Sequence, residues 1–523
     1  MIMSAPAHLG DVLATHARMF PDKVGARDLE RAMTFRVWND RACRLANALG
    51  GLGLSKGDRV CALAYNCLEW TEIYAATAMA GLVAVPVNFR LLGPEVQYIV
   101  ENCEAKAIIV QHELLDVVES VRSALPVPAD NFIVFGGRFG GKCPPGYRDY
   151  EDLMANASNS KPVVTVGADD PWTLMYTSGT TGKPKGAIRS HRGSAMLSLV
   201  TEVEMGLSPR DSALLVMPMC HANSLYFFGA FTYCGAACTV YSRKSFDPEH
   251  LVRTLADGAA TFTSLVPTHY IMMLGLPAAV RMRYNVDAVT KLMISSAPAR
   301  RDTKLAIMDY FKNSGLFELY GSTEAGWVTM LHPDEQFSKL GSVGRECIGS
   351  RPIRLLDAGG NDVKEGEAGE LYSCNPYTFD GYWKLPEKTR EAFRGDYCTV
   401  GDLARRDEEG YIYLVDRKSN MIISGGENVY PSEVESLLGA HAKVKDVAVV
   451  GIADPKWGER VHAVIIPREG ETATEDEIID WCRDRIAGYK RPRSVSFIRD
   501  DEMPRTATGK ILHRVLRSRL GEA

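Results

Sequence analysis

The chain has 523 residues, of which 46% are hydrophobic and 24% are charged. This composition excludes wholesale disorder, collagen and coiled coil, and the length allows about three domains at roughly 150 residues each. The 60 Lys and Arg against 65 Asp and Glu leave a net charge of −5, so nucleic acid, whose partners usually carry a basic excess, is not the expected ligand.

Apolar runs and helical patterns alternate over residues 11–170. Residues 59–65 indicate a buried strand followed by a helix from about Glu69, and residues 107–110 indicate a second strand followed by a helix over 114–125. Residues 131–145 are rich in Gly and Pro, which predicts a surface loop. The alternation is typical of an α/β fold with a largely parallel sheet.

Three further strands are expected at residues 214–217, 263–266 and 291–294, each followed by residues suited to a tight turn. In open sheets of this kind, ligands bind at the carboxyl ends of the strands. The polar motifs described below fall at such ends. After about Gly341 the pattern changes to short strands with turn residues, which predicts a small antiparallel sheet or barrel.

The last hundred residues are expected to form a separate α+β unit. One helix begins at Pro431 and ends at Gly439. Thr474 and Glu477 have the spacing of a capping box, which predicts a further helix over 475–486.

The cysteines and the apolar segments indicate the compartment. None of the 12 cysteines forms a CxxC pair, which predicts mostly buried free thiols in a reducing environment. Residues 1–20 lack the basic start and unbroken apolar core of a secretory signal. The longest apolar stretch, Ile73–Val87, contains Gly81 and Pro86 and is shorter than the ~20 residues of a membrane-spanning helix. We therefore expect a cytoplasmic protein without integral membrane association, and the sequence leaves a homodimer open.

The most distinctive segment is the loop Tyr176–Gly186, which follows an apolar strand at 172–175 and contains three glycines, four Ser or Thr hydroxyls and two lysines. Glycines let backbone N–H groups converge on an anion, hydroxyls add donors and lysines supply charge, so the loop predicts a triphosphate site. It is not a Walker A loop, because Pro184 stands where that motif needs Ser or Thr. A flexible surface turn is the alternative for this segment taken alone.

Five further motifs follow the loop in order: Tyr320–Glu324, Gly401–Asp402, Asp416–Arg417, Gly425–Asn428 and Pro504–Lys510. With the loop, they resemble the acyl-adenylate-forming superfamily, which includes acyl-CoA synthetases, peptide-synthetase adenylation domains and beetle luciferases. The resemblance extends from about residue 11 to residue 517. It implies that a carboxylate attacks the α-phosphate of ATP to give acyl-AMP and pyrophosphate, and that a thiol, usually that of coenzyme A, then displaces AMP.

The resemblance and the pattern of elements together imply an α/β fold in two parts. Residues 1–417 would form a large ATP- and acyl-binding domain of stacked α/β layers with a small β-barrel. Residues 418–523 would form a small mobile α+β domain. In the family this domain rotates about a hinge, here Lys418 and Ser419, so that each half-reaction meets different groups.

The first half-reaction needs cations, because a carboxylate must approach a polyanionic triphosphate. By resemblance, Lys510 bridges the carboxylate and the α-phosphate, whereas taken alone it would be a solvated lysine in a basic segment. Mg²⁺ prefers hard oxygens and needs one or two protein ligands, for which the resemblance implies Glu324 and Thr177. Taken alone, Glu324 would be a carboxylate at a helix start.

The resemblance also implies the nucleotide contacts. Tyr320 would stack on adenine, and Asp402 would accept both ribose hydroxyls, with a turn aspartate as the alternative. The implied ATP- and AMP-binding residues are Thr177, Ser178, Gly179, Thr180, Thr181, Gly182, Lys185, Ser296, Ala297, Pro298, Tyr320, Gly321, Ser322, Thr323, Asp402 and Arg417.

His221 matches the family position whose ring closes the acyl pocket and shifts to admit the thiol. The adjacent Cys220 could instead indicate metal or Cys/His chemistry, but no other His or Cys lies at a ligand-like spacing. By resemblance, Gly425 and Gly426 let the pantetheine arm of coenzyme A pass, and Trp457 covers the arm or the nucleotide. A hairpin glycine pair and a core tryptophan are the alternatives.

The chain departs from the family pattern at the hinge, where Ser419 and Asn420 follow Lys418, and around the acyl pocket. Ser295 and Ser296 replace glycines common in relatives, and Ser224 stands where glycine is frequent. Such substitutions narrow or polarise the pocket, which favours a small to medium-chain or aromatic acid over a very long chain.

The leading interpretation is an ATP-dependent acyl-CoA ligase, an AMP-forming acid–thiol ligase that uses ATP, Mg²⁺, coenzyme A and a small carboxylic acid. The alternative among enzymes is a standalone adenylation enzyme that loads a carrier-protein thiol. The intact Lys510, Glu324 and Asp402 argue against a nucleotide-binding homologue without turnover. A Ser or Cys hydrolase is disfavoured because the sequence has no G-x-S-x-G elbow in a suitable context.

Overall fold

The computed structural model describes residues 7–136, 143–177, 183–295, 299–418, 420–424, 427–483, 485–506 and 509–521. The chain forms two compact units. Unit 1 comprises Met1–Pro352 and Ser373–Cys398, and unit 2 comprises Ile353–Tyr372 and Thr399–Ala523. The boundary between moving domains that we expect after Arg417 stays a prediction.

Unit 1 contains two large sheets. The eight-stranded sheet has the order β19-β9-β8-β4-β3-β5-β6-β7, and the nine-stranded sheet has the order β16-β15-β14-β13-β12-β10-β11-β1-β2. The strands of the first are β3 (Arg59–Leu63), β4 (Val83–Val87), β5 (Ala107–Gln111), β6 (Phe132–Phe135), β7 (Arg148–Asp149), β8 (Pro171–Thr177), β9 (Lys185–Ser190) and β19 (Gly381–Tyr382). Those of the second are β1 (Val24–Arg27), β2 (Ala32–Thr34), β10 (Ser212–Leu215), β11 (Ala237–Val240), β12 (Phe262–Leu265), β13 (Lys291–Ser295), β14 (Gly315–Ser322), β15 (Gly326–Leu331) and β16 (Arg345–Glu346).

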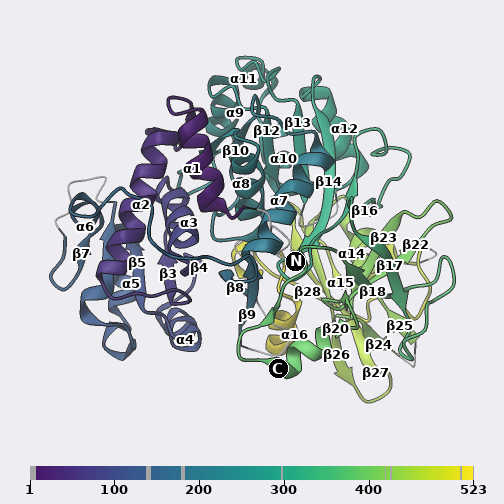
Figure 1. Ribbon diagram of the computed structural model, residues 1–523. Helices are drawn as coiled ribbons and strands as arrows, with labels where there is room; N and C mark the ends of the chain where they lie inside the picture. Colours follow the sequence, from purple (N-terminus) through teal and green to yellow (C-terminus); the bar gives the residue numbers. More distant parts are fainter. Residues whose placement is uncertain are drawn as a thin grey trace. The chain divides into compact units, whose positions relative to one another are not determined.

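Helices lie between these sheets and on their outer faces (Figure 1). They are α1 (Leu9–Met19), α2 (Phe35–Gly51), α3 (Glu69–Ala80), α4 (Gly93–Cys103), α5 (Leu115–Glu119), α6 (Tyr150–Ala155), α7 (His191–Met205), α8 (Ala222–Tyr233), α9 (Pro248–Asp257), α10 (Pro267–Leu274), α11 (Ala278–Arg281), α12 (Arg301–Tyr310) and α13 (Pro386–Ala392). The largest core cluster joins both sheets to α1, α2, α3, α7 and α8. Two further clusters pack α4 and α5, and α9, α10 and α12, on the outer faces.

Strand β3 shows how the sequence sets these layers. Val60 and Ala62 belong to the central cluster, whereas Cys61 and Leu63 belong to the cluster under α4 and α5. Successive side chains of a strand point to opposite faces, so a continuous apolar run of this kind covers both sides of a buried parallel strand. The α/β layering predicted from the alternating pattern is confirmed.

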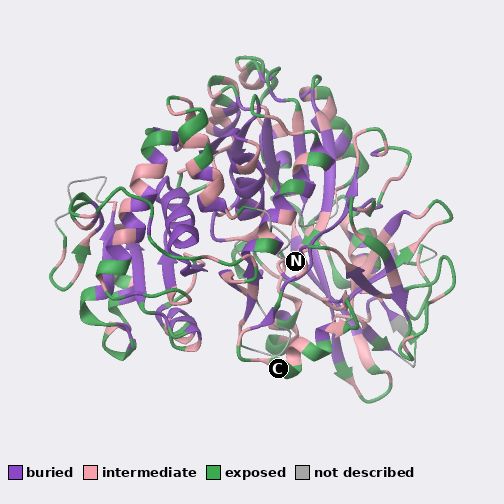
Figure 2. Cartoon of the chain, in the orientation of Figure 1, coloured by how far each residue is buried: buried purple, intermediate pink, exposed green. Residues whose placement is uncertain are grey.

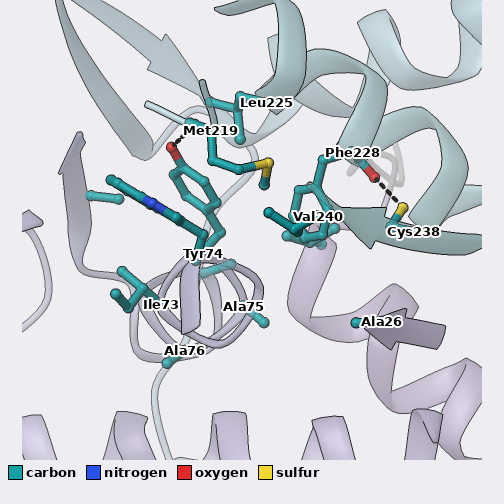
Figure 3. Close-up of a cluster of buried hydrophobic side chains, with 14 of the residues drawn as sticks. Ala26, Ile73, Tyr74, Ala75, Ala76, Met219, Leu225, Phe228, Cys238 and Val240 are labelled. Atoms are coloured by element: carbon teal, nitrogen blue, oxygen red, sulfur yellow. Dashed lines mark hydrogen bonds between the residues drawn. The ribbon is translucent and has the colours of Figure 1, made fainter. Parts of the chain in front are cut away.

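Helix α3 lies in the central layer, and all 12 of its residues are buried (Figure 2). It ends at Gly81, whose left-handed φ of 64° favours glycine. The hydroxyl of Tyr74 donates a hydrogen bond to the backbone oxygen of Met219 at 2.8 Å (Figure 3). This bond fixes the segment that leads into α8, where His221 lies.

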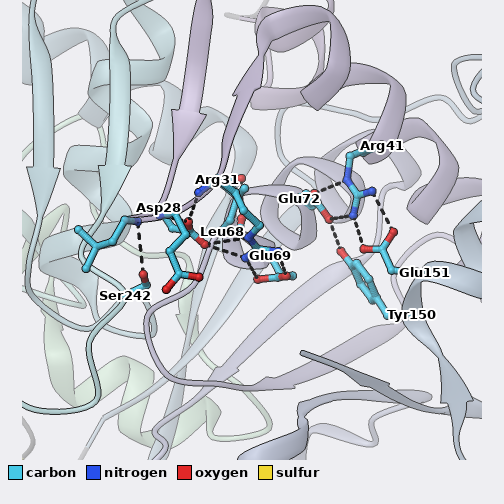
Figure 4. Close-up of polar contacts among 12 residues, drawn as sticks. Asp28, Arg31, Arg41, Leu68, Glu69, Glu72, Tyr150, Glu151 and Ser242 are labelled. Carbon is cyan, nitrogen blue, oxygen red and sulfur yellow. Dashed lines mark hydrogen bonds and ion pairs between the residues drawn. The ribbon is translucent and has the colours of Figure 1, made fainter. Parts of the chain in front are cut away.

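Buried charges in α3 are paired with two arginines (Figure 4). Arg41 of α2 contacts Glu72 at 2.5 Å, and the hydroxyl of Tyr150 donates to Glu72 at 2.7 Å. The Glu72 side chain is only 2% exposed, and burial raises its pKa. Arg31 pairs in the same way with Glu69 at 2.7 Å. These pairs keep two buried carboxylates in a helix that has no solvent-facing side.

Replacing Arg41 with methionine should therefore destabilise unit 1 by about 3–5 kcal/mol, because it leaves the Glu72 carboxylate buried without its cation. Urea denaturation followed by tryptophan fluorescence measures the change. Arg36→Met is the matched control on the same helix, since Arg36 pairs with an exposed Asp22 and should cost less than about 1 kcal/mol. Equal effects of the two variants would contradict the structural role given to Glu72.

Two small sheets follow in the second half of the chain. Strand order β20-β21-β18-β22-β23, with β17 on β18, forms the antiparallel sheet expected after Gly341, and β25-β24-β27-β26, with β28 on β27, forms the other. The strands are β17 (Arg351–Leu356), β18 (Gly369–Cys374), β20 (Phe393–Arg394), β21 (Tyr397–Cys398), β22 (Asp402–Arg406), β23 (Ile412–Arg417), β24 (Ile422–Ser424), β25 (Glu427–Val429), β26 (Val444–Asp454), β27 (Gly458–Pro467) and β28 (Ser494–Phe497). Helices α14 (Pro431–Gly439) and α15 (Glu475–Trp481) cover one face of the second sheet, and α16 (His513–Gly521) covers the other.

Three local predictions need correction. The helix expected over 114–125 is only the short α5 flanked by single 3₁₀ turns. The loop expected at 131–145 contains the buried strand β6, because the apolar run Phe132–Phe135 outweighs the glycines that follow it. Helix α15 ends at Trp481 rather than near residue 486.

Other predictions are confirmed. Helix α14 has the predicted bounds, and the Thr474 hydroxyl accepts the predicted hydrogen bond from the backbone N–H of Glu477. All 12 cysteines are free, and nine of them are buried. The apolar stretch from residue 73 to 87 divides into α3 and β4. Over the described ranges, no helix combines the length and apolarity that crossing a bilayer requires.

Candidate active site

The glycine-rich loop connects two antiparallel strands of unit 1. Thr177 ends β8 and pairs in register with Lys185, which begins β9. The two residues therefore flank the loop. The predicted loop residues Ser178, Gly179, Thr180, Thr181 and Gly182 lie outside the described residues.

Glu324 lies in the turn between β14 and β15, where Ser322 pairs with Gly326. The alternative that it starts a helix is therefore wrong. A Cβ on Gly321 would lie 2.3 Å from the backbone oxygen of Gly326, so only glycine fits at this point of the hairpin. The tight hairpin holds the Glu324 side chain in a buried position, 7% exposed.

Two hydroxyl groups bind the Glu324 carboxylate. The Thr177 hydroxyl donates to Oε1 at 3.1 Å, and the Tyr382 hydroxyl donates to the same oxygen at 2.9 Å. The Lys185 ammonium lies 4.0 Å from the centroid of the Tyr382 ring, and desolvation lowers the pKa of this lysine, while Glu324 opposes that effect. Tyr382 is not among the residues predicted from the sequence, where its only signal is the dipeptide Gly381-Tyr382, which forms a short strand.

The oxygens of this cluster fit a magnesium ion. Both described hydrogen bonds engage Oε1 of Glu324, which leaves Oε2 as the acceptor for a cation, and the Thr177 hydroxyl is a second hard oxygen beside it. Among the described residues, no group of three or more His, Cys, Asp or Glu side chains could hold a metal by itself. Mg²⁺ that is carried mainly by phosphates keeps most of its waters and needs only one or two protein oxygens.

The other predicted residues of this motif lie at the end of β14. Tyr320 is half-buried and pairs with Thr329 of β15, and Gly321 is exposed. The hydroxyl of Ser322 accepts from the backbone N–H of Ala325, which closes the turn. The Thr323 carbonyl accepts from Arg189 at 3.3 Å and from Tyr226 at 3.0 Å. The adjacent predicted residues Ser296, Ala297 and Pro298 are not among the residues described.

Unit 2 brings Asp402 and Arg417 together. Asp402 is the first residue of β22, pairs in register with Arg417 of β23, and forms an ion pair with it at 3.0 Å. The alternative that Asp402 is a turn residue is therefore wrong. The Arg417 guanidinium orients the Asp402 carboxylate at the start of the strand. A carboxylate held in this way is suited to accept hydrogen bonds from two neighbouring hydroxyl groups.

Lys510 lies near this pair within the same unit. Its backbone N–H donates to the Thr506 hydroxyl at 3.1 Å, and its carbonyl accepts from the Thr506 N–H at 2.8 Å, so a short turn presents the side chain. Desolvation and the charge of Arg417 lower the pKa of Lys510 to about 8, whereas the charges of Asp402 and Asp416 act to raise it. Lys510 is exposed, as the alternative of a solvated lysine also requires, and what distinguishes its surroundings is the set of fixed charges close to it.

The predicted coenzyme A and hinge residues are described in part. Trp457 lies in the hairpin turn between β26 and β27, half-buried, with the Arg493 guanidinium 3.8 Å from its ring centroid. It is thus not the core residue of the alternative. Lys418 is exposed and contacts Glu370 at 2.9 Å. The predicted residues Ser419, Gly425 and Gly426 fall outside the described ranges.

His221 is the N-cap residue of α8. Burial and the charge of Arg90 lower its pKa to about 4, so the ring is neutral at pH 7. Its Nε2 atom is buried and has no hydrogen-bond partner within the described part of the chain. A neutral ring with an unpaired nitrogen is compatible with the predicted role in closing the acyl pocket, which stays a prediction.

Two family models match the chain. Residues 13–383 match the family described as AMP-binding enzyme, and residues 433–510 match the AMP-binding enzyme C-terminal domain. The chain therefore belongs to the AMP-binding enzyme family. It is an AMP-forming acid–thiol ligase that uses ATP, Mg²⁺ and coenzyme A: it activates a carboxylic acid as acyl-AMP and transfers the acyl group to coenzyme A.

Three relatives illustrate the similarity. A feruloyl-CoA synthase from Amycolatopsis sp is 35% identical over 98% of this chain and 99% of its own. An indoleacetate–CoA ligase from Aromatoleum aromaticum is 32% identical over 96% of each chain. The crystal structure of an anthranilate CoA ligase in complex with anthranoyl-AMP has a TM-score of 0.89 and 27% identity, and the match covers 99% of this chain and 98% of that one.

Proposed function

We propose that Thr177, Lys185 and Glu324 bind the triphosphate of ATP together with Mg²⁺, and that Tyr320, Asp402 and Arg417 bind the adenosine. The hydrogen bond from Thr177 to Glu324 carries this assignment, because it joins the head of the glycine-rich loop to the buried carboxylate. When bound, Mg²⁺ would neutralise phosphate charge. Glu324 and Thr177 would hold it, while Lys185 adds a cation on the same side.

We further propose that Lys510 pairs the carboxylate of the acid with the α-phosphate, and that the small domain then rotates about Lys418 and Ser419. After the rotation, Gly425, Gly426 and Trp457 would line the path of the pantetheine arm. The Arg493 guanidinium lies over the Trp457 ring, and this contact supports the proposed role of Trp457 in binding coenzyme A. An aromatic ring with a cation on one face offers a suitable surface for a nucleotide.

The lowered pKa of Lys510 predicts a specific pH dependence. A lysine with a pKa of about 8 loses its charge as the pH rises through that value, so kcat/KM for ATP in acyl-AMP formation should fall above pH 8. Lys510→Arg keeps the charge at all accessible pH values and should remove this alkaline limb. Initial rates of pyrophosphate release between pH 6 and 10 measure both profiles, and an unchanged limb in Lys510→Arg would exclude Lys510 as its source.

For the acid, we propose a small to medium-chain or aromatic carboxylic acid. The relatives named above are named for aromatic acids, and the buried Ser224 and Ser295 add polar groups near α8. A panel of carboxylic acids, assayed for pyrophosphate release with and without coenzyme A, tests the proposal. We expect acyl-CoA and AMP from at least one aromatic acid. Acyl-AMP that reacts only with a pantetheinylated carrier protein would instead favour the alternative adenylation enzyme.

The unpaired cysteines support a reducing, cytoplasmic location for this enzyme. A homodimer remains part of the proposal, and light scattering on the purified chain would give its mass in solution.

A further inference from the structure

Several buried polar atoms near the carboxyl ends of β12 and β13 have no partner among the residues that the structure describes. The hydroxyl of Ser264 on β12, one end of the Asn223 amide on α8 and Nε2 of His221 make no hydrogen bond with any described residue. Ser264 is only 3% exposed. Buried polar atoms are almost always hydrogen-bonded, so unpaired atoms in one region indicate that a ligand supplies the missing partner.

The packing of α8 places these atoms together. Phe227 and Phe231 pack their rings on Phe262 of β12, with centroids 4.7 and 4.9 Å apart. Because α8 joins the parallel strands β10 and β11, it runs antiparallel to them and to β12. Ser264 lies two residues beyond Phe262 on the same face of β12, which is about 6.6 Å along the strand. The same distance along α8 corresponds to about four residues toward the start of the helix. Ser264 therefore lies level with the first turn of α8, where Asn223 is found.

A direct contact supports this placement. The Asn223 side chain donates a hydrogen bond to the Ser295 hydroxyl at 3.0 Å. Ser264 pairs in register with Met293 of the neighbouring strand, so Ser295 lies on the same face one step nearer the carboxyl end. One end of the Asn223 amide is thus held by Ser295, and the other end, which no described residue binds, belongs to the helical turn that lies level with Ser264. Such a pair matches a hydroxyl group, which both donates and accepts a hydrogen bond.

We propose that Asn223, Ser264 and Ser295 form a polar subsite that binds a hydroxyl substituent of the acid, so that the enzyme selects hydroxylated carboxylic acids over their hydrocarbon analogues. The inference rests on the proposed function and specifies the class of acid. Ser295 orients the Asn223 amide, while Asn223 and Ser264 contact the substituent. The neutral ring of His221 borders the subsite without adding a charge.

The subsite predicts discrimination between matched acids. A pocket built to hydrogen-bond a hydroxyl rejects the analogue without it, because its buried polar groups then stay unpaired. The matched acids are benzoate with its three monohydroxy isomers, 3-phenylpropenoate with its 4-hydroxy form, and hexanoate with 6-hydroxyhexanoate. In at least one of these pairs, kcat/KM should be about 10-fold or more higher for the hydroxylated acid than for its hydrocarbon analogue. Hexanedioate is included because a carboxylate substituent would be favoured by the charge of Arg90.

Two variants identify the residues responsible. Ser264→Ala and Asn223→Ser should each lower the ratio of kcat/KM values for the selected pair toward one, and calorimetry should show weaker binding of the hydroxylated acid. Ser198→Ala is the matched control: this buried hydroxyl on α7 is already bonded to the Ser194 carbonyl at 3.0 Å, and its removal should leave the ratio unchanged. Thermal unfolding of each variant confirms that the fold is intact.

The outcomes separate this inference from the proposed function. Ratios near one in every pair, a ratio that Ser264→Ala leaves unchanged, or a preference for hexanedioate would each overturn the polar subsite while leaving the ligase activity in place. If no acid in the panel yields acyl-CoA, the acid class given under the proposed function is wrong.

Discussion

Replacing Lys510 with alanine should abolish acyl-AMP formation while the enzyme still transfers the acyl group from supplied acyl-AMP to coenzyme A. Two unit charges of the same sign at ~4 Å repel by about 4 kcal/mol at an effective dielectric constant of ~20. Loss of the cation that offsets this repulsion should lower the first rate by roughly 10³-fold. In the second half-reaction the thiol attacks the uncharged acyl carbon of acyl-AMP, so this step should not need the same cation.

Single-turnover assays of the two half-reactions measure the two rates separately. Lys445→Ala is a suitable control, because this lysine is an exposed residue of unit 2 that pairs with Asp500. It should leave both rates near those of the parent enzyme. If Lys510→Ala lowered both half-reactions equally, Lys510 would have a structural role rather than the one we assign.

Replacing Glu324 with glutamine should weaken MgATP binding and lower pyrophosphate release by about 10²-fold or more. The amide keeps the size of the side chain and can still accept a hydrogen bond from Thr177, but it lacks the negative charge that a hard cation requires. The expected signature is a much larger loss of affinity for ATP in the presence of Mg²⁺ than in its absence.

Calorimetric titration with ATP, at several Mg²⁺ concentrations, gives this comparison without relying on turnover. Glu387→Gln on the exposed surface of α13 provides the control for a lost carboxylate. An equal loss of affinity with and without Mg²⁺ would show that Glu324 supports the hairpin rather than the metal ion.

Sequence patterns predicted the layers of unit 1 well, because long apolar runs such as those of β3 and β5 leave few alternatives. They failed where a short segment depends on its neighbours. Phe132–Phe135 was hidden by the glycines that follow it, and its strand exists because β5 offers it a partner along its whole length. Helix α15 ends early at Trp481, whose indole N–H donates to the Leu437 carbonyl of α14.

The candidate site was predicted through motifs rather than through geometry. The resemblance pointed to Glu324 and Asp402, but the local context suggested a helix start for the first and a turn for the second. Glu324 instead lies in the turn of the β14–β15 hairpin, and Asp402 begins a paired antiparallel strand. Tyr382 could not be found from the sequence, since it reaches Glu324 only because β19 pairs with β9. Likewise, the relation between Ser264 and Asn223 depends on how α8 packs on β12.

The most direct test of the account follows the oxygen atoms of the acid. If a carboxylate labelled with ¹⁸O attacks the α-phosphate, one labelled oxygen must remain on AMP when the thiol displaces it. Mass spectrometry of the products should therefore find one ¹⁸O atom in AMP for each thioester formed, with unlabelled pyrophosphate. Unlabelled AMP, or label in inorganic phosphate with ADP as the nucleotide product, would contradict activation through acyl-AMP.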